Sequence, residues 1–245
     1  MSKRDYLNLS ESQEGFIGLL EAGQMALESI ADPDVFRSLY DAVVNVFMRN
    51  IGYKQFIDTI SPESWAKGQA CHVITRNWGA NVKATDLIAD YLPDVGSKIL
   101  DLGCNDGALV RKLTEMGYDC YGVDLPEVIE KARDMYPDSA DRLSVCNLET
   151  DELSSDSYDF VLALAVIEHL KRYDLLLDKI AKVLKPQGIL YLTTSNREYR
   201  EIDVWHTHHF TVEELSKLAN WVGLKPLKYK RVDSRTNLTG IFERT

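Results

Sequence analysis

Short β-type runs alternate with helical periods from Lys98 to the end of the chain, and this alternation constrains the fold more than any other feature of the sequence. A strand, a crossover helix and a second strand form parallel neighbours, so the pattern predicts an α/β fold with a mostly parallel sheet and helices on both faces. The runs typical of strands are 99–102, 119–123, 143–146, 160–164 and 189–194, with helical periods at 107–116, 127–135 and 174–184. A further helix is predicted after Thr211, where Glu214 completes a capping-box spacing, and two strands, 225–232 and 239–243, close the chain.

The first part of the chain has a different character. Apolar residues recur at helical spacing over 16–30 and 36–47, and further helical turns are predicted near 61–63 and 81–93. We therefore predict two domains, with residues 1–80 forming a helical lid that sets substrate specificity and residues 81–245 forming the α/β domain. The same apolar helices would serve equally well to pair two copies in a homodimer, and the sequence leaves that alternative open.

Charge and composition exclude several functional classes. The chain has 28 Lys and Arg against 38 Asp and Glu, a net charge of −10, which disfavours binding to a nucleic acid. No stretch approaches the roughly 20 apolar residues of a membrane span, and no apolar segment typical of a secretory signal follows the first basic residues, so we expect a cytoplasmic protein. The four cysteines (Cys71, Cys104, Cys120 and Cys146) form no CxxC pair, and we expect reduced thiols.

A glycine loop offers the clearest binding signal. Residues 98–109 read KILDLGCNDGAL, which predicts a strand, a turn with Gly103 and Gly107, and the start of a helix whose N–H groups suit an anion. Asp124 ends the next strand 23 residues after Asp101, close to the spacing at which an acidic side chain meets ribose hydroxyls. Asn105 replaces the middle glycine of a dinucleotide loop, and the carboxylate of Asp101 is suited to an amino group. An amino-acid nucleoside therefore fits better than a pyrophosphate.

Four motifs in this order resemble those of the class I S-adenosylmethionine-dependent methyltransferases, and small-molecule O-methyltransferases of the ubiquinone-biosynthesis type are closest in pattern. The motifs are Asp101–Gly107, Gly122–Asp124, Tyr158–Leu170 and Leu184–Gly188. The resemblance implies a Rossmann-like sheet of seven strands with the last one antiparallel, and S-adenosylmethionine as cofactor. By position it implies a cofactor site made of Asp101, Gly103, Cys104, Asn105, Gly107, Asp124, Leu125, Asn147, Leu148 and Leu164. Within it, Asp101 and the glycines would surround the methionine moiety, Asp124 would hold the ribose, Leu125, Asn147 and Leu148 would frame the adenine, and Leu164 would lie near the methyl group.

The histidines suggest how an acceptor would be activated. A hydroxyl is a poor nucleophile until a base takes its proton, and histidine does this near neutral pH. His169 follows a predicted strand at the edge where ligands of open α/β sheets bind, so we predict it as the base. His206, His208 and His209 form a second group, from which we assign His208 to the acceptor site. The expected reaction is in-line methyl transfer to a hydroxyl of a small metabolite or a sugar.

Two alternatives stay open. Glu168, His169 and a later His-rich segment are similar to the metal-binding residues of small-RNA 2′-O-methyltransferases, but Ala165 stands where a further Glu of their Glu-x-x-Glu-His motif would be. That replacement and the net charge favour a site without a metal ion. The second alternative is a protein of this fold that binds the cofactor without transferring the methyl group.

Overall fold

The structure, a computed structural model, describes Val35 and residues 84–153, 157–196, 206–232 and 237–245. The chain divides into two compact units, residues 1–76 and 77–245, and all but Val35 of the described residues belong to the second. The predicted helices at 16–30, 36–47 and 61–63 lie outside the described residues, so the helical lid of residues 1–80 stays a prediction.

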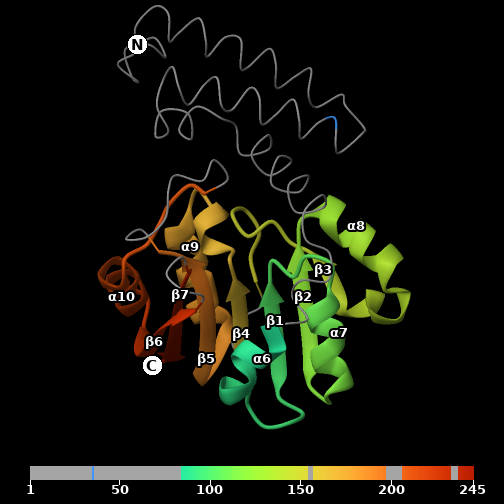
Figure 1. The fold of residues 1–245 in the computed structure, drawn as a ribbon, viewed down its shortest axis with the longest axis horizontal. Coiled ribbons are helices and arrows are strands. Elements are labelled where there is room, and N and C mark those ends of the chain that lie inside the picture. The colour runs from blue at the N-terminus through green and yellow to red at the C-terminus, as the bar shows by residue number, and fades with distance from the viewer. Residues whose placement is uncertain (1–34, 36–83, 154–156, 197–205, 233–236) are drawn as a thin grey trace, which may run out of the picture. The chain divides into compact units, whose positions relative to one another are not determined.

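Within the second unit, strands and helices alternate as the sequence predicts (Figure 1). The strands are β1 (Lys98–Leu102), β2 (Asp119–Asp124), β3 (Leu143–Val145), β4 (Tyr158–Leu164), β5 (Leu184–Ser195), β6 (Leu224–Val232) and β7 (Asn237–Arg244). The α-helices are α6 (Ala84–Ile88), α7 (Ala108–Glu115), α8 (Pro126–Met135), α9 (Tyr173–Val183) and α10 (Val212–Trp221). Short 3-10 turns are η2 (Ala89–Tyr91), η3 (Pro137–Arg142) and η4 (Ile167–His169).

The strands form one seven-stranded sheet in the order β3-β2-β1-β4-β5-β7-β6. The first five strands in that order are parallel to one another, while β7 runs antiparallel to both β5 and β6. The Rossmann-like fold and the antiparallel last strand are therefore confirmed. Because the parallel strands all end at one edge, the loops that follow β1, β2, β3 and β4 meet there (Figure 1).

Two apolar layers hold the helices against the sheet. Leu100 and Leu102 of β1 belong to a layer that packs against α9 and α10, whereas Ile99 belongs to the layer with α6, α7 and α8. Strand β4 alternates in the same way, since Val161 faces the first layer and Phe160 the second. Burial on both faces explains why these strands are continuous apolar runs in the sequence. Among the described residues, no helix combines the length and the apolar character needed to cross a bilayer.

Strand β5 differs from its prediction. The sequence predicts a helix to residue 184, a break at Pro186-Gln187-Gly188 and a strand from residue 189. In the structure Leu184 already pairs with Tyr158, and Gln187 takes a positive φ of 64° next to the register shift between Tyr158 and Phe160. The sequence correctly indicates a local turn at Gln187. Because β5 pairs with β4 on both sides of this turn, the turn is part of the strand as a bulge.

Candidate active site

The glycine loop after β1 is tightly held against β2. The N–H groups of Gly103 and Cys104 both donate to the carbonyl oxygen of Val123, at 2.9 and 3.0 Å. Gly103 has φ = 69°, and a Cβ there would lie 2.6 Å from Cγ2 of Val166. Gly103 therefore needs to be glycine for conformation and for space, and its neighbour Val166 connects the loop to the turn that follows β4.

Asn105 stands where a glycine is common, and the structure explains how it fits. Its φ is 53°, a left-handed conformation that asparagine tolerates better than most residues. Its N–H donates to Oδ2 of Asp124 at 2.8 Å, while the N–H of Leu125 donates to Oδ1 at 2.7 Å. The carboxylate of Asp124 thus links the first loop to the end of β2. Burial raises the pKa of Asp124 to about 6, and the two N–H donors oppose that rise.

Asp101 carries a buried carboxylate that suits a cationic ligand. It is 1% exposed, and its Oδ2 has no hydrogen-bond partner among the described residues. Burial, and then the charges of Asp124 and Asp106, raise the pKa of Asp101 to about 8. A carboxylate in such a place is costly unless a positive group pairs with it. The residues present therefore fit a ligand with an amino group near Asp101 and hydroxyls near Asp124, as S-adenosylmethionine has.

Other predicted cofactor residues are placed around the same edge with different roles. Cys104 is fully buried and packs beside Gly122, so its thiol is not accessible to a ligand. The side chain of Asn147 accepts the N–H of Glu149 at 3.0 Å and so shapes the loop after β3. Leu148 is buried in the core, and Leu164 at the end of β4 is half-buried. Gly107 precedes α7 with φ = 73° and would clash with Leu143 if it carried a Cβ.

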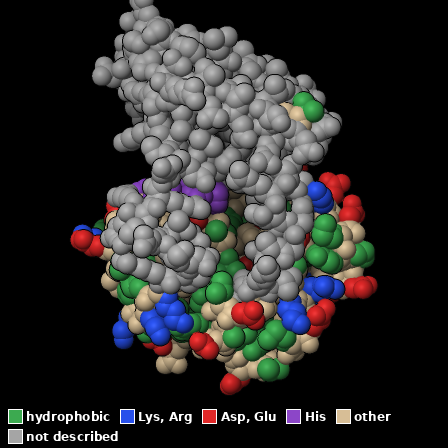
Figure 2. Space-filling view, viewed as in Figure 1, with side chains coloured by type: hydrophobic (Ala, Val, Ile, Leu, Met, Phe, Trp, Pro, Cys, Tyr) green, Lys and Arg blue, Asp and Glu red, His purple; other side chains and the backbone are tan. Residues whose placement is uncertain are grey.

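The second group of site residues lies after β4 and before α10. Backbone and side-chain bonds fasten these segments together: Thr207 donates from N to the Glu168 carbonyl oxygen at 2.7 Å and from Oγ1 toward the carbonyl oxygens of Glu168 and Leu170 at 3.0 and 2.5 Å. Figure 2 shows histidine side chains close together on the visible face. The hydrogen bonds of Thr207 connect the two histidine segments.

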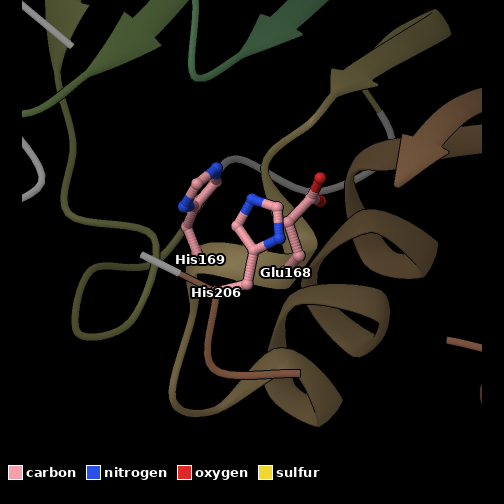
Figure 3. A group of neighbouring side chains, drawn as sticks. All are labelled: Glu168, His169 and His206. Carbon is pink, nitrogen blue, oxygen red and sulfur yellow. The ribbon is translucent and has the colours of Figure 1, made fainter. Parts of the chain in front are cut away.

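The structure places His206, rather than His208, beside His169. The rings of His169 and His206 have centroids 4.7 Å apart, whereas His208 lies against Tyr173 and Phe210 at 4.8 and 4.5 Å. His206 is 4% exposed and His169 half-buried. Glu168, His169 and His206 each offer a ligand atom, and these three atoms lie within 4.8 Å of one another (Figure 3).

Several supporting residues escaped the sequence analysis. Lys179 of α9 is buried and donates from Nζ to the carbonyl oxygens of Leu148 and Asp151, at 2.8 and 2.7 Å, which fixes the loop after β3. Thr194 of β5 donates to Oε2 of Glu168 at 2.9 Å. A lysine within an amphipathic helix and a threonine within an apolar strand carry no local signal of such roles. His206 itself was visible as part of the His-rich segment, but spacing does not rank it above His208.

Comparison with known proteins agrees with this geometry. A family model described as a methyltransferase domain matches residues 68–245, which is most of the chain. The chain belongs to this methyltransferase family. Its fold is that of class I S-adenosylmethionine-dependent methyltransferases, as in a crystal structure of such an enzyme from Mesorhizobium loti, with a TM-score of 0.57 and 19% identity over 65% of this chain and 96% of that one.

Curated relatives of this methyltransferase are named ubiquinone biosynthesis O-methyltransferases. That of Bartonella tribocorum is 27% identical over 164 residues, 62% of this chain and 64% of the relative. The mitochondrial protein of Homo sapiens is 36% identical over 112 residues, 43% of this chain and 30% of the relative. The chain spans about half the length of the curated relatives it matches.

Proposed function

We propose that this methyltransferase moves the methyl group of S-adenosylmethionine to a hydroxyl group of a small-molecule acceptor. One observation carries the proposal: the contact between Gly103 and Val166 joins the loop suited to the cofactor to the turn that bears Glu168 and His169. Donor and acceptor groups would therefore meet at a single edge of the sheet. The curated relatives, whose names specify O-methyl transfer, support oxygen as the acceptor atom.

The chain's residues would divide the work as follows. Asp101 would accept the amino group of the cofactor and Asp124 its ribose hydroxyls, while the N–H groups of Asn105 and Leu125 keep Asp124 in place. S-adenosylmethionine supplies, when bound, a methyl group on a positively charged sulfur that is ready for in-line displacement. The acceptor oxygen gains the methyl group and loses a proton, and the histidine cluster is where that proton is removed or its loss is promoted. His169 would act as the base, and His208 would line the acceptor's side.

The chemical class of the acceptor is a further part of the proposal. A small molecule suits the relatives' names, whereas neither the relatives nor the described residues point to a sugar or to a homodimer. A cytoplasmic location is likewise a prediction from the sequence alone, and the human relative is named as mitochondrial.

Radiolabelled S-adenosylmethionine and a panel of phenols, other alcohols and amines provide the test, with mass spectrometry to locate the added methyl group. Methylated oxygen in the wild type, and loss of cofactor binding in Asp124→Ala, are expected. Products methylated only on nitrogen or carbon would contradict the oxygen assignment. S-adenosylhomocysteine binding without product on any acceptor class, including RNA, would favour a non-catalytic binding protein instead.

A further inference from the structure

We infer that Glu168, His169 and His206 bind a divalent transition-metal ion. Glu168 and His169 belong to η4, and His206 arrives 37 residues further along the chain, yet their ligand atoms lie within 4.8 Å of one another. Figure 3 shows the His206 ring between His169 and the Glu168 side chain. From the sequence, the replacement of a further Glu by Ala165 and the net charge of −10 favour a site without metal, but the fold still brings three ligands from two segments together.

The donor set indicates which ions would bind. Two imidazoles and one carboxylate suit first-row divalent ions such as Mn²⁺, Fe²⁺, Co²⁺ and Zn²⁺, while Mg²⁺ and Ca²⁺ prefer a shell made of oxygen. Ligand atoms stand about 2.0 to 2.2 Å from such ions, so pairs of ligands are roughly 3 to 3.5 Å apart in a formed site. The present separations of at most 4.8 Å mean that the ligand atoms must approach by no more than about 2 Å to form such a site.

Neighbouring residues hold the ligands in place. Glu168 is 2% exposed and its Oε2 accepts the hydroxyl of Thr194 at 2.9 Å, which orients the carboxylate. The Thr207 N–H, on the Glu168 carbonyl oxygen at 2.7 Å, fixes the backbone next to His206. Second-sphere bonds of this kind are what metal sites use to set ligand geometry. A buried carboxylate also gains from a cation, because burial without positive charge is costly.

Within the described part of the chain the group offers three protein ligands, the number typical of a reactive site. Structural metal sites use four protein ligands, whereas reactive sites use three and keep a position open for a substrate. His169 is half-buried and lies at the edge where the cofactor loop ends, so an acceptor oxygen can reach the open position. An ion there lowers the pKa of an acceptor hydroxyl and so promotes loss of its proton to water. Binding of the ion is independent of the proposed function, but this role rests on it.

The competing explanation is a hydrogen-bonded cluster of one carboxylate and two imidazoles that holds the turn together. That cluster would have no particular affinity for metals. It also leaves His169 as the base, because its ligand nitrogen is then not occupied by an ion. Measured metal affinity separates the two explanations directly.

Metal binding to the purified full chain, stripped with chelator, provides the test. Calorimetry and electron paramagnetic resonance with Mn²⁺, and visible absorption with Co²⁺, should show one ion per chain, and Mg²⁺ should bind at least tenfold more weakly. The Co²⁺ spectrum should lack a thiolate charge-transfer band, since none of the described cysteines belongs to the group of three ligands. A thiolate band would place the ion elsewhere and overturn the assignment.

Substitutions locate the ion. His206→Ala and Glu168→Gln should each weaken Mn²⁺ binding 100-fold or more. Thr194→Val, which removes only the hydroxyl on Glu168, should weaken it about 10- to 100-fold. His208→Ala is the matched control for metal affinity, because His208 lies in the same segment but outside the group of three, and its Mn²⁺ affinity should change less than threefold.

Folding of each variant is checked by S-adenosylhomocysteine binding, which uses the other loop. Because Glu168 and His206 are buried, His169→Gln, at a half-buried position, serves as a second ligand variant that spares the core. A wild type that binds none of the four transition metals at millimolar concentration, or variants that bind them as well as His208→Ala does, would overturn the inference. Metal binding without methyl transfer to any hydroxyl would contradict the proposed function alone, so the two failures are distinguishable.

Discussion

At the scale of single residues, two buried carboxylates dominate the site. Asp101 and Asp124 lie at the ends of adjacent parallel strands, and burial raises the pKa of both, to about 8 and about 6. Asp101 in the ligand-free protein is therefore mostly protonated at neutral pH, because burial disfavours its charged form. The buried carboxyl lowers the stability of the ligand-free protein, but it suits the binding of a ligand with an amino group.

Asp101 gives the ligand-free protein a defined pH dependence. The pKa of its carboxyl is about 8 when folded and near 4 when unfolded, so the folded state binds more protons between these values and the free energy of unfolding falls as pH rises from about 4 to about 8. Asp101→Asn should flatten this slope and make the ligand-free protein more stable than wild type at pH 8, while weakening cofactor binding. Thermal unfolding of both proteins at pH 5, 6.5 and 8 measures this pH dependence of stability. If the stabilities of the two proteins change with pH by the same amount, Asp101 is not responsible.

Gly103→Ala should damage both stability and cofactor binding. The new Cβ meets Val166 at 2.6 Å and the residue keeps a φ of 69°, so we expect a loss of about 1 to 3 kcal/mol in the free energy of unfolding. Gly96→Ala is the matched control, since its φ is 91° but no atom lies within 4 Å of the added carbon. Urea unfolding and S-adenosylhomocysteine titration should show that only Gly103→Ala weakens cofactor binding; equal effects on binding would argue against a role of this loop.

At the scale of elements, connections between segments decide where the histidines lie. The segment from His206 to Phe210 runs between η4 and the start of α10, with Thr207 bonded to η4 and the Phe210 N–H bonded to the carbonyl oxygen of Ser195 in β5. The capping box of α10 is formed as predicted: Thr211 accepts the N–H of Glu214, whose side chain accepts the N–H of Thr211. Both ends of the segment are therefore fixed.

Thr211→Ala removes the side-chain half of this capping box. We expect a loss of about 1 kcal/mol in the free energy of unfolding, because the N–H of Glu214 would lose its partner at the start of α10. Urea unfolding measures this loss. Thr211→Ser keeps the hydroxyl and should retain most of the stability; if the serine variant loses as much as the alanine variant, packing of the methyl group and not capping is responsible.

At the scale of the whole molecule, the parallel strands place the loops suited to cofactor binding and to catalysis at the same edge of the sheet. A ligand bound there contacts the ends of several strands at once and stabilises the folded unit by its binding free energy. The methyltransferase fold owes its versatility to this geometry, since the strands are fixed while the loops vary.

S-adenosylhomocysteine should therefore raise the unfolding temperature. At a concentration 100 times its dissociation constant it adds about 2.7 kcal/mol, which for a unit of this size corresponds to roughly 5 to 10 °C. Differential scanning calorimetry with and without ligand measures the shift. Asp124→Ala should abolish it at the same concentration, and an unchanged shift in that variant would remove Asp124 from the ribose site.

Much of this molecule is determined by the sequence itself. The alternation of strands and helices predicted the α/β class, the resemblance at four motifs predicted the seven-stranded sheet, and the same motifs predict Asp101, Gly103 and Asp124 as cofactor residues. These features are local: burial on both faces makes apolar strands, and a turn that approaches a ligand requires glycine. The bulge in β5 was missed because the turn signal at Gln187 is local, whereas its incorporation depends on pairing with β4.

Only the tertiary structure decided which histidine joins His169 and Glu168. His206 and His208 have the same side chain and lie two residues apart, so no pattern in the sequence separates them. In the structure Thr207 bonds to η4, His206 lies beside His169, and His208 lies against Tyr173 and Phe210. Long-range hydrogen bonds of this kind, such as that of Thr194 to Glu168, connect side chains from segments that are distant in the sequence. The spacing of residues along the chain does not predict such bonds.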